Sequence, residues 1–138
     1  MSRLLAMDLG NTNLKWGLFE DGALCLHGVL SNDLPWDFAV APWGELKAGD
    51  RACVGSVSNS SEAKLRASWS NDSVSLEFCR QDFELVMNSS GPDLKVVGTD
   101  RLLAVIAWRA RSKQAAVIVD FGTAINIEVL SADGQYRG

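Results

Sequence analysis

The sequence predicts a mixed α/β fold, and three features of the chain support this class. Two stretches, 5–22 and 117–134, follow one template: an apolar strand, an Asp-x-Gly turn, a second strand and an Asp-Gly hairpin. Between them, strand-like and helix-like apolar spacings alternate along the chain. The hairpin signals make neighbouring strands antiparallel, as in a mixed sheet. Asp8 of the first stretch corresponds to Asp120 of the second, an offset of 112 residues. A repeat at this offset indicates duplication of a whole domain rather than a solenoid.

The chain is predicted to begin with a hairpin-rich sheet. Apolar residues indicate a buried strand, and an Asp21-Gly22 turn joins the two strands that follow it. These three strands are expected at 4–8, 14–20 and 23–29. The stretch 31–49 contains two prolines and two tryptophans, and is predicted to be a loop with a short helix.

A strand, a helix and another strand come next. Ser60 and Ser61 are predicted to cap a helix over 62–69, because serine side chains accept hydrogen bonds from the first unpaired amides of a helix. The flanking strands are expected at 51–57 and 74–78. Breaker residues then predict an irregular stretch over 81–95.

The clearest helix is expected over 100–111, with Thr99 as its N-cap, since its apolar residues recur at helical spacing. The continuous apolar run 115–119 predicts a buried strand. A second strand over 125–130 leads into the Asp133-Gly134 turn.

Composition limits the possible partners. At 138 residues the chain can bury one ordinary core but is short for two complete domains. Its 47% apolar and 22% charged residues are typical of a soluble globular protein. A net charge of −4 without a Lys/Arg cluster argues against nucleic acid as a partner. No apolar run approaches the roughly 18 residues that cross a bilayer, so no membrane partner is expected either.

The N-terminal pattern and the cysteines favour a cytoplasmic location. The N-terminus runs straight into a strand pattern, without the pattern of a signal peptide. The three cysteines are widely spaced, unlike zinc ligands, and fit small apolar residues in a reducing compartment. His27 is the only histidine, which argues against a His-based triad or a multi-His metal site.

Asp8 begins the first candidate site. A carboxylate at the end of a buried strand, followed by a glycine turn, is where α/β proteins hold phosphate and its metal ion. Gly10 would let backbone amides approach anionic oxygens. Asn11 and Thr12 would add uncharged donors, and Lys15 a cation. The alternative is an ordinary turn whose polar side chains satisfy backbone groups.

The segment 120–124, Asp-Phe-Gly-Thr-Ala, is the second site. Two Asp-x-Gly turns, each at the end of a buried strand, could grip one polyphosphate from both sides of a cleft. A duplicated hairpin retained for folding is the alternative.

The third site is Gly98-Thr99-Asp100-Arg101, at the start of the strongest helix. Backbone N–H groups are unpaired there and favour negative charge, so Asp100 could simply complement the helix dipole while Arg101 is solvated. Alternatively, Asp100 would deprotonate a hydroxyl and Arg101 would clamp a carboxylate. The side chains of these three motifs are enough for phosphoryl transfer, because that reaction depends on positioning and charge neutralisation.

In this order and at these intervals, the motifs resemble those of the type III pantothenate kinases. The D-x-G-N-T-x-x-K element stands at 8–15, G-x-D-R at 98–101 and D-F-G-T-A at 120–124. Segments 54–57 and 133–138 look like the family's S-V strand end and the start of its D-G-x-Y-x-G-G element. The family belongs to the acetate and sugar kinase, Hsp70 and actin superfamily. The resemblance therefore implies an α/β fold of ribonuclease-H-like (actin-like ATPase) domains with a mixed sheet.

The resemblance also implies a domain organisation. Residues 1–114 would form the first ribonuclease-H-like domain, and 115–138 the first hairpin of a second, truncated copy. Because the family has a further half, we expect this sequence to be part of a longer protein, with a shortened paralogue as the alternative. On its own, the apolar hairpin over 115–130 would be short of partners.

The implied activity is ATP-dependent phosphorylation of pantothenate to 4′-phosphopantothenate, the first step of coenzyme A biosynthesis. Asp100 would be the catalytic base for the pantothenate hydroxyl. Asp8 would hold Mg²⁺ through water, and Asp120 would hold a monovalent cation, K⁺ or NH₄⁺. The family is dimeric, so a homodimer is implied, with the acceptor pocket at or near the subunit interface.

Substrate contacts carry over residue by residue. Arg101 would bind the carboxylate of pantothenate. The acceptor would contact Gly98, Thr99, Asp100 and Arg101. ATP would contact Asp8, Leu9, Gly10, Asn11, Thr12, Asn13, Leu14, Lys15 and Thr123.

The chain departs from the family pattern near these motifs. Gly91 falls about where the family has a tyrosine, and Asp93-Leu94 replace an N-P pair, which predicts a weaker or altered acceptor pocket. After D-F-G-T-A, Asn126 and Glu128 replace threonine and aspartate, which keeps polar groups but changes their length.

Two other functions stay open: a non-catalytic regulatory or accessory protein, and a superfamily kinase for another small hydroxy acid. The four charges of Asp8, Asp100, Arg101 and Asp120 argue against the first, because a pure binding module does not need all of them. The G-x-D-R motif favours pantothenate over sugars.

Overall fold

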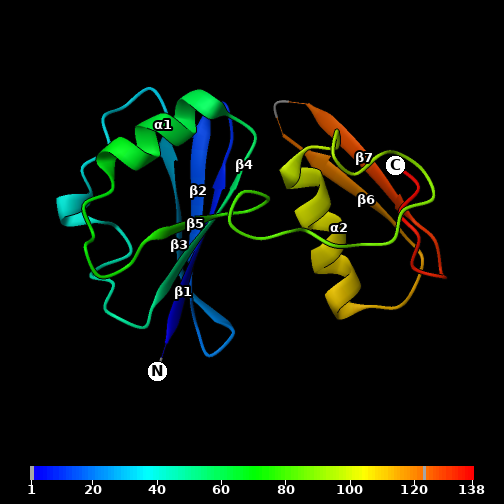
Figure 1. Ribbon diagram of the computed structural model, residues 1–138, viewed down its shortest axis with the longest axis horizontal. Coiled ribbons are helices and arrows are strands. Elements are labelled where there is room, and N and C mark those ends of the chain that lie inside the picture. Colours follow the sequence, from blue (N-terminus) through cyan, green and yellow to red (C-terminus); the bar gives the residue numbers. More distant parts are fainter. Residues whose placement is uncertain (1, 123) are drawn as a thin grey trace. The chain divides into compact units, whose positions relative to one another are not determined.

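The computed structural model describes residues 2–122 and 124–138, which form two compact units, Met1–Phe83 and Glu84–Gly138 (Figure 1). Each unit has its own hydrophobic core.

The first unit is built on a five-stranded mixed sheet with the order β3-β2-β1-β4-β5. The strands are β1 (Arg3–Leu9), β2 (Asn13–Glu20), β3 (Ala23–Ser31), β4 (Arg51–Ser56) and β5 (Leu76–Phe78). The first three pair antiparallel, whereas β1, β4 and β5 run parallel. The Asp21-Gly22 hairpin is confirmed: both residues have positive φ, 48° and 80°. The order and directions of the strands confirm the predicted α/β class with a mixed sheet.

One short and one longer helix accompany this sheet. The loop after β3 contains a 3₁₀ helix, η1 (Phe38–Val40), and β4 leads into α1 (Asn59–Ser68), which lies against the sheet (Figure 1). The prediction that Ser60 and Ser61 cap this helix is wrong. Ser58 is the N-cap, and its side chain accepts the N–H of Ser61. The helix therefore begins three residues before the predicted position.

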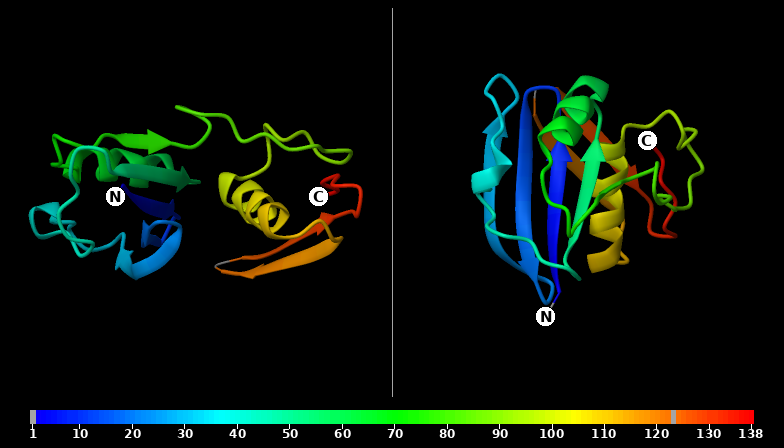
Figure 2. Two further views of the ribbon diagram at one scale, coloured as in Figure 1. Left: turned by 90° about the horizontal axis from the view of Figure 1, so that it is seen from below. Right: turned by 60° about the vertical axis from the view of Figure 1, so that its left-hand side comes forward.

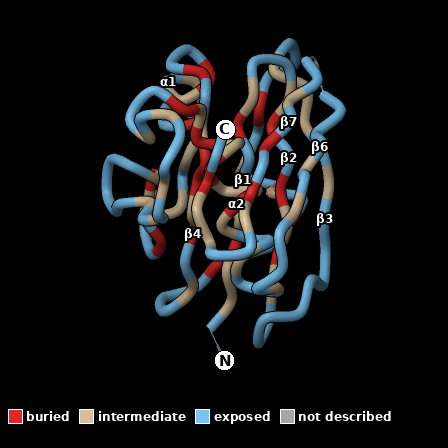
Figure 3. Tube along the Cα trace, turned by 90° about the vertical axis from the view of Figure 1, so that its right-hand side faces the viewer, coloured by how far each residue is buried: buried red, intermediate tan, exposed pale blue. Residues whose placement is uncertain are grey.

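The core of the first unit combines aromatic and aliphatic side chains. The ring of Trp43, which is only 2% exposed, lies 5.5 Å from that of Trp16 and 5.0 Å from that of Phe38. Trp69, just after α1, stacks on Trp43 at 6.2 Å. The loop that follows β3 thus supplies core residues, while β3 itself is mostly exposed (Figure 3). The buried aliphatic residues are Leu5, Met7, Leu9, Leu14, Leu18, Leu46, Ala52, Val54, Leu65 and Val74.

An ion pair ties the beginning of β1 to the turn before β4. The Asp50 carboxylate accepts hydrogen bonds from the Arg3 side chain, at 2.6 Å from Nη2, and from the backbone N–H groups of Arg3 and Lys47, both at 2.9 Å. The guanidinium hydrogen bond lowers the pKa of Asp50 from 3.8 to about 2.

Replacing Asp50 with asparagine is expected to lower the free energy of unfolding by about 1–3 kcal/mol, because a charge-assisted pair and its turn bonds are weakened. The folded pKa is depressed, so this stabilisation is present above pH 3.8 and is lost as pH falls towards 2. Denaturant unfolding of both proteins at pH 7 and at lower pH measures the difference. Glu77→Gln breaks an exposed ion pair with Arg51 and is the control, with an expected loss below about 1 kcal/mol. Equal losses for the two variants would contradict the assignment.

The second unit packs one helix on a two-stranded hairpin (Figure 2). The helix is α2 (Thr99–Arg111), and the strands are β6 (Ala116–Phe121) and β7 (Ile125–Leu130), paired antiparallel. Leu102 and Val105 of α2 pack with Leu130 and Tyr136, all at most 1% exposed. Thr99 was predicted to be the N-cap, and this is wrong. Gly98 is the N-cap residue and makes no side-chain capping bond, whereas Thr99 is buried in the first turn.

The prediction that the apolar run 115–119 is wholly buried is also wrong. One face of β6 packs towards the core through Ala116 and Ile118. Val117 and Val119 point the other way and are 66% and 42% exposed (Figure 3 shows β6 as largely exposed). A strand alternates its side chains between two faces, and within this unit α2 covers only one of them.

The two compact units differ from the two expected copies of the duplication. The units divide after Phe83, whereas the copies were expected to divide after residue 114. α2 belongs to the first copy in that scheme but packs on β7 in the second unit. The two units are defined by contacts within the structure, whereas the two copies are defined by a sequence repeat. The domains 1–114 and 115–138 therefore stay a prediction.

Candidate functional site

Asp8 lies near the carboxyl end of β1, opposite Lys15 of β2 on one side and Gly55 of β4 on the other. Its side chain is 51% exposed, and Oδ2 is 3.8 Å from Nζ of Lys15. The sheet thus presents a carboxylate and an ammonium group to solvent where a glycine turn begins. This arrangement can bind a hydrated cation together with an anionic oxygen.

The turn after Asp8 uses the backbone of Gly10 internally. The Gly10 N–H donates to the Asn13 carbonyl at 3.0 Å, and the Gly10 carbonyl accepts from Nδ2 of Asn32 at 2.9 Å. Asn11 and Thr12 are exposed. If this turn binds an anion, as predicted, the donors would be Asn11, Thr12 and Lys15 rather than the Gly10 amide.

Two of the predicted ATP contacts are core residues. Leu9 and Leu14 are both 0% exposed and pack inside the first unit. Their side chains hold the turn on the sheet, so any contact that they make with a nucleotide would involve backbone atoms. Asn13 is half-buried at the start of β2.

Asp100 and Gly98 depend on each other at the start of α2. Oδ1 of Asp100 accepts the backbone N–H of Arg101 at 2.8 Å. A Cβ atom at position 98 would lie 2.6 Å from that oxygen, so only glycine leaves room for this carboxylate position. The G-x-D-R spacing thus places Asp100, which is half-buried, on the first turn of a helix, and a larger residue at position 98 would make its carboxylate move.

Arg101 is bound by an acidic residue of β7. Its Nε and Nη2 groups pair with the two carboxylate oxygens of Glu128, which is 2% exposed. Tyr136 donates its hydroxyl hydrogen to Glu128. The Glu128 carboxylate raises the pKa of Arg101, while burial and then Glu128 raise the pKa of Tyr136 to about 12.

Glu128 and Tyr136 were not among the predicted site residues. An acidic residue within an otherwise apolar strand was the available signal, because a buried carboxylate needs a cationic partner. The partner lies 27 residues earlier in the chain, so only the packing of α2 on β7 reveals it.

The second Asp-x-Gly turn resembles the first with one difference in pairing. Asp120 is exposed near the end of β6, and the Gly122 N–H donates to the Ala124 carbonyl at 3.0 Å, as the Gly10 N–H does to Asn13. Asp120 lies opposite Asn126, whereas Asp8 lies opposite a lysine. The predicted ATP contact Thr123 lies outside the described residues.

Asp8 and Asp120 fit cations that take most of their ligands from water and phosphate rather than from the protein. Across 2–122 and 124–138 no group of three or more His, Cys, Asp or Glu residues could hold a metal ion. Asp8 and Asp120 each offer one exposed carboxylate. One carboxylate with waters and phosphate oxygens suits Mg²⁺, which dehydrates reluctantly. The donor set therefore fits an ion brought with a nucleotide rather than a cage made by the protein.

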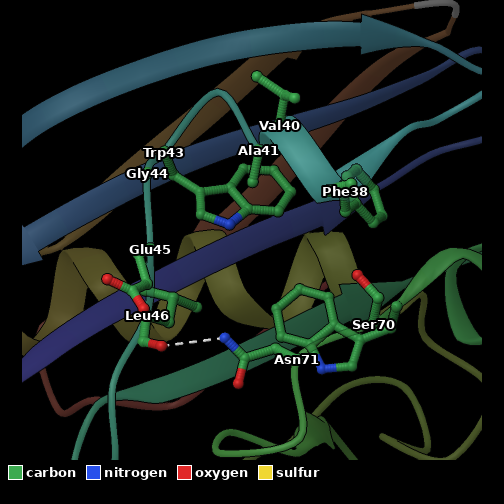
Figure 4. Close-up of a pocket in the computed structure, with 11 residues that line it drawn as sticks. Phe38, Val40, Ala41, Trp43, Gly44, Glu45, Leu46, Ser70 and Asn71 are labelled. Carbon is green, nitrogen blue, oxygen red and sulfur yellow. Dashed lines mark hydrogen bonds between the residues drawn. The ribbon is translucent and has the colours of Figure 1, made fainter.

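A pocket of about 460 Å³ in the first unit contains none of the motif residues (Figure 4). Phe38, Trp43 and Trp69 form its aromatic lining, and Nδ2 of Asn71 donates to the Leu46 carbonyl at 3.0 Å across it. Its lining has little charge. This pocket does not supply the groups that phosphate chemistry needs.

Gly91 lies at a close approach between two backbone segments. A Cβ atom here would lie 2.4 Å from the carbonyl oxygen of Arg137. The segment before α2 therefore packs backbone against backbone on the segment that carries Tyr136. Whether this departure alters the acceptor pocket stays a prediction.

Gly91→Ala is expected to lower the free energy of unfolding of the second unit by about 1–3 kcal/mol, because a backbone group must shift. Chemical denaturation measures the effect. Gly122→Ala is the control: its Cβ would meet only the Ala124 carbonyl, at an ordinary 3.7 Å. If both variants are equally stable, the close approach at Gly91 is absent.

The fold and the motifs define a mixed α/β protein with acidic turns at its strand ends. The family model of the type III pantothenate kinases matches residues 4–138, and the chain belongs to this family. It is similar to a type III pantothenate kinase of Thiobacillus denitrificans, with 33% identity over 97% of this chain and 54% of the relative. The relative from Nitrosospira multiformis is 28% identical over 98% and 52%. The chain thus spans about half the length of the curated relatives it matches.

Solved structures show a weaker likeness. An Aquifex aeolicus Ppx/GppA phosphatase aligns with 100% of this chain and 51% of its own, at 10% identity and a TM-score of 0.44. Among the described residues, no helix has the length and apolar character needed to cross a membrane.

Proposed function

We propose that the protein transfers the terminal phosphoryl group of ATP to the 4′-hydroxyl of pantothenate, the first step of coenzyme A biosynthesis. The observation that carries this proposal is the family match over 4–138 with all three motifs present. The positions of Asp8 and Asp100 support it, because both place a carboxylate at the accessible end of a regular element.

In the proposed reaction, Asp100 accepts the proton of the pantothenate hydroxyl as the oxygen attacks the terminal phosphorus. The bond between that phosphorus and the bridging oxygen breaks, and ADP leaves with the bond's electrons. Arg101 binds the pantothenate carboxylate, while Lys15 and the 8–15 turn bind ATP.

Two cations complete the proposed site. Asp8 would hold Mg²⁺ through water, and Asp120 would hold K⁺ or NH₄⁺. Both ions would neutralise charge on the phosphates. We further propose that the protein acts in the cytoplasm as a homodimer, as its family membership suggests.

The test is a coupled assay of ADP formation with ATP, Mg²⁺, K⁺ and pantothenate. It compares this chain with a chimera that adds the complementary C-terminal half of the Thiobacillus denitrificans relative. The chimera is expected to form 4′-phosphopantothenate, identified by mass, only when K⁺ or NH₄⁺ is present. The C-terminal half alone and the whole relative are the negative and positive controls.

The outcomes separate the remaining functions. ADP formation with another hydroxy acid, but not with pantothenate, would identify a superfamily kinase with a different acceptor. The close backbone contact at Gly91, where the family has a tyrosine, is the observation that favours this alternative. A folded chimera that binds ATP without transferring phosphate to any acceptor would indicate a regulatory protein.

A further inference from the structure

The guanidinium group of Arg101 is held along one edge. Nε and Nη2 donate to the two carboxylate oxygens of Glu128, and Nη2 is 3.0 Å from Oε2. Two parallel bonds fix the plane of a guanidinium group more firmly than one. The Glu128 side chain is 3% exposed and that of Arg101 is 34% exposed. The Glu128 carboxylate is therefore buried, whereas the Arg101 side chain is partly accessible.

Tyr136 completes the network. Its hydroxyl group donates to Glu128 and lies 3.5 Å from Nη2 of Arg101. Tyr136 is 0% exposed. Its backbone N–H donates a hydrogen bond to the Asn88 carbonyl at 2.9 Å, and its carbonyl accepts one from the Ser90 N–H at 3.1 Å. Glu128 thus accepts from three donors, which offsets the cost of burying its charge.

Building on the function proposed above, we propose that Glu128 and Tyr136 are positioning residues that hold Arg101 in the orientation in which it binds the acceptor's carboxylate. The Arg101 backbone N–H is bonded to Asp100, so the base and the clamp share one turn of α2. Among the described residues, the hydrogen bonds of the Arg101 side chain to Glu128 and Tyr136 use Nε and Nη2, which leaves Nη1 as the donor for the acceptor.

This arrangement makes acceptor binding depend on geometry. Glu128 neutralises Arg101, so the attraction for a second carboxylate comes from aligned hydrogen bonds rather than from net charge. Without Glu128 the arginine keeps its charge but loses its orientation. Without the Tyr136 hydroxyl, Glu128 lacks one donor. Each loss is expected to weaken acceptor binding about tenfold, the effect of one charge-assisted hydrogen bond.

The kinetic test uses whichever protein forms 4′-phosphopantothenate in the assay above, the chain or the chimera. It compares two acceptors. One is pantothenate, and the other is its analogue with an alcohol in place of the carboxylate. Glu128→Gln and Tyr136→Phe are expected to raise KM for pantothenate about tenfold, with kcat and KM for ATP within about twofold of wild type. KM for the alcohol is expected to stay unchanged, because it has no carboxylate for Arg101.

Two further variants sharpen the comparison. Glu128→Asp keeps the charge and is expected to recover part of the loss, whereas Glu77→Gln breaks an exposed ion pair in the first unit and is expected to change nothing. Equal losses with both acceptors, or an unchanged KM for pantothenate, would overturn the proposal.

A second measurement needs no activity. Tyr136 is the only tyrosine, so the ultraviolet absorbance of tyrosinate reports on it alone. Burial and Glu128 raise the pKa of Tyr136 from its ordinary 10.0 to about 12. Glu128→Gln is expected to lower this pKa, and Arg101→Gln to raise it further, because the guanidinium group favours the phenolate.

The two measurements distinguish the two proposals. An ordinary pKa for Tyr136 in the wild-type chain would overturn the network even if the kinase is active. A raised pKa that responds to both variants, in a protein that does not phosphorylate pantothenate, would instead contradict the proposed function and with it the role given to this network.

Discussion

Asp100→Asn is expected to lower kcat for phosphoryl transfer by about 10²–10⁴-fold while the fold is retained. The amide cannot accept the proton of the attacking hydroxyl, and general base catalysis typically contributes a factor of this size. An asparagine oxygen can still accept the Arg101 N–H, and it occupies the space that Gly98 leaves. Steady-state kinetics on the active chimera, with circular dichroism to check the fold, measure the effect.

Asp37→Asn is the matched control for this variant. Oδ1 of Asp37 also accepts a nearby backbone N–H, that of Ala39 at 3.0 Å, but Asp37 is exposed at the start of η1 and belongs to none of the predicted motifs. Its turnover is expected to equal that of wild type. Near-normal kcat for Asp100→Asn would refute the assignment of the base.

Asp8→Asn is expected to reduce kcat/KM for ATP about 100-fold or more, with a higher requirement for Mg²⁺. The carboxylate is the proposed anchor of the hydrated ion, and an amide lacks its charge. The fold should persist, because the side chain is half exposed and its ion pair with Lys15 is long, at 3.8 Å. Initial rates over a range of Mg²⁺ concentrations test this.

Asp21→Asn is the control for that experiment. Asp21 lies in the hairpin at the other end of β2, with a positive φ that asparagine also tolerates. It is expected to leave the Mg²⁺ dependence unchanged. If Asp8→Asn behaves in the same way, the 8–15 turn does not carry the metal ion.

The sheet of the first unit was largely predictable from the sequence, because its signals are local. The Asp21-Gly22 turn sets the pairing of β2 with β3, and the apolar residues of β1 indicate burial. The cap of α1 was not predictable from composition alone. Several serines lie close together there, and Ser58 is chosen because its backbone is extended where the chain leaves β4.

The predicted site residues were also found from signals within short windows of sequence. The places of Asp8 and Asp100 at the ends of regular elements follow from short motifs. The pairing of Arg101 with Glu128 depends on how α2 packs on β7, which no short window contains. The exposed face of β6 was missed for a related reason: an apolar run indicates that a strand can be buried, not which faces have a partner.

The most direct test of the central claim is a crystal structure of the active chimera with a non-hydrolysable ATP analogue, Mg²⁺, K⁺ and pantothenate. We predict that the carboxylates of Asp8, Asp100 and Asp120 surround the terminal phosphate, with the pantothenate hydroxyl within hydrogen-bonding distance of Asp100. A bound nucleotide with any one of these three carboxylates on an unrelated face would contradict the account.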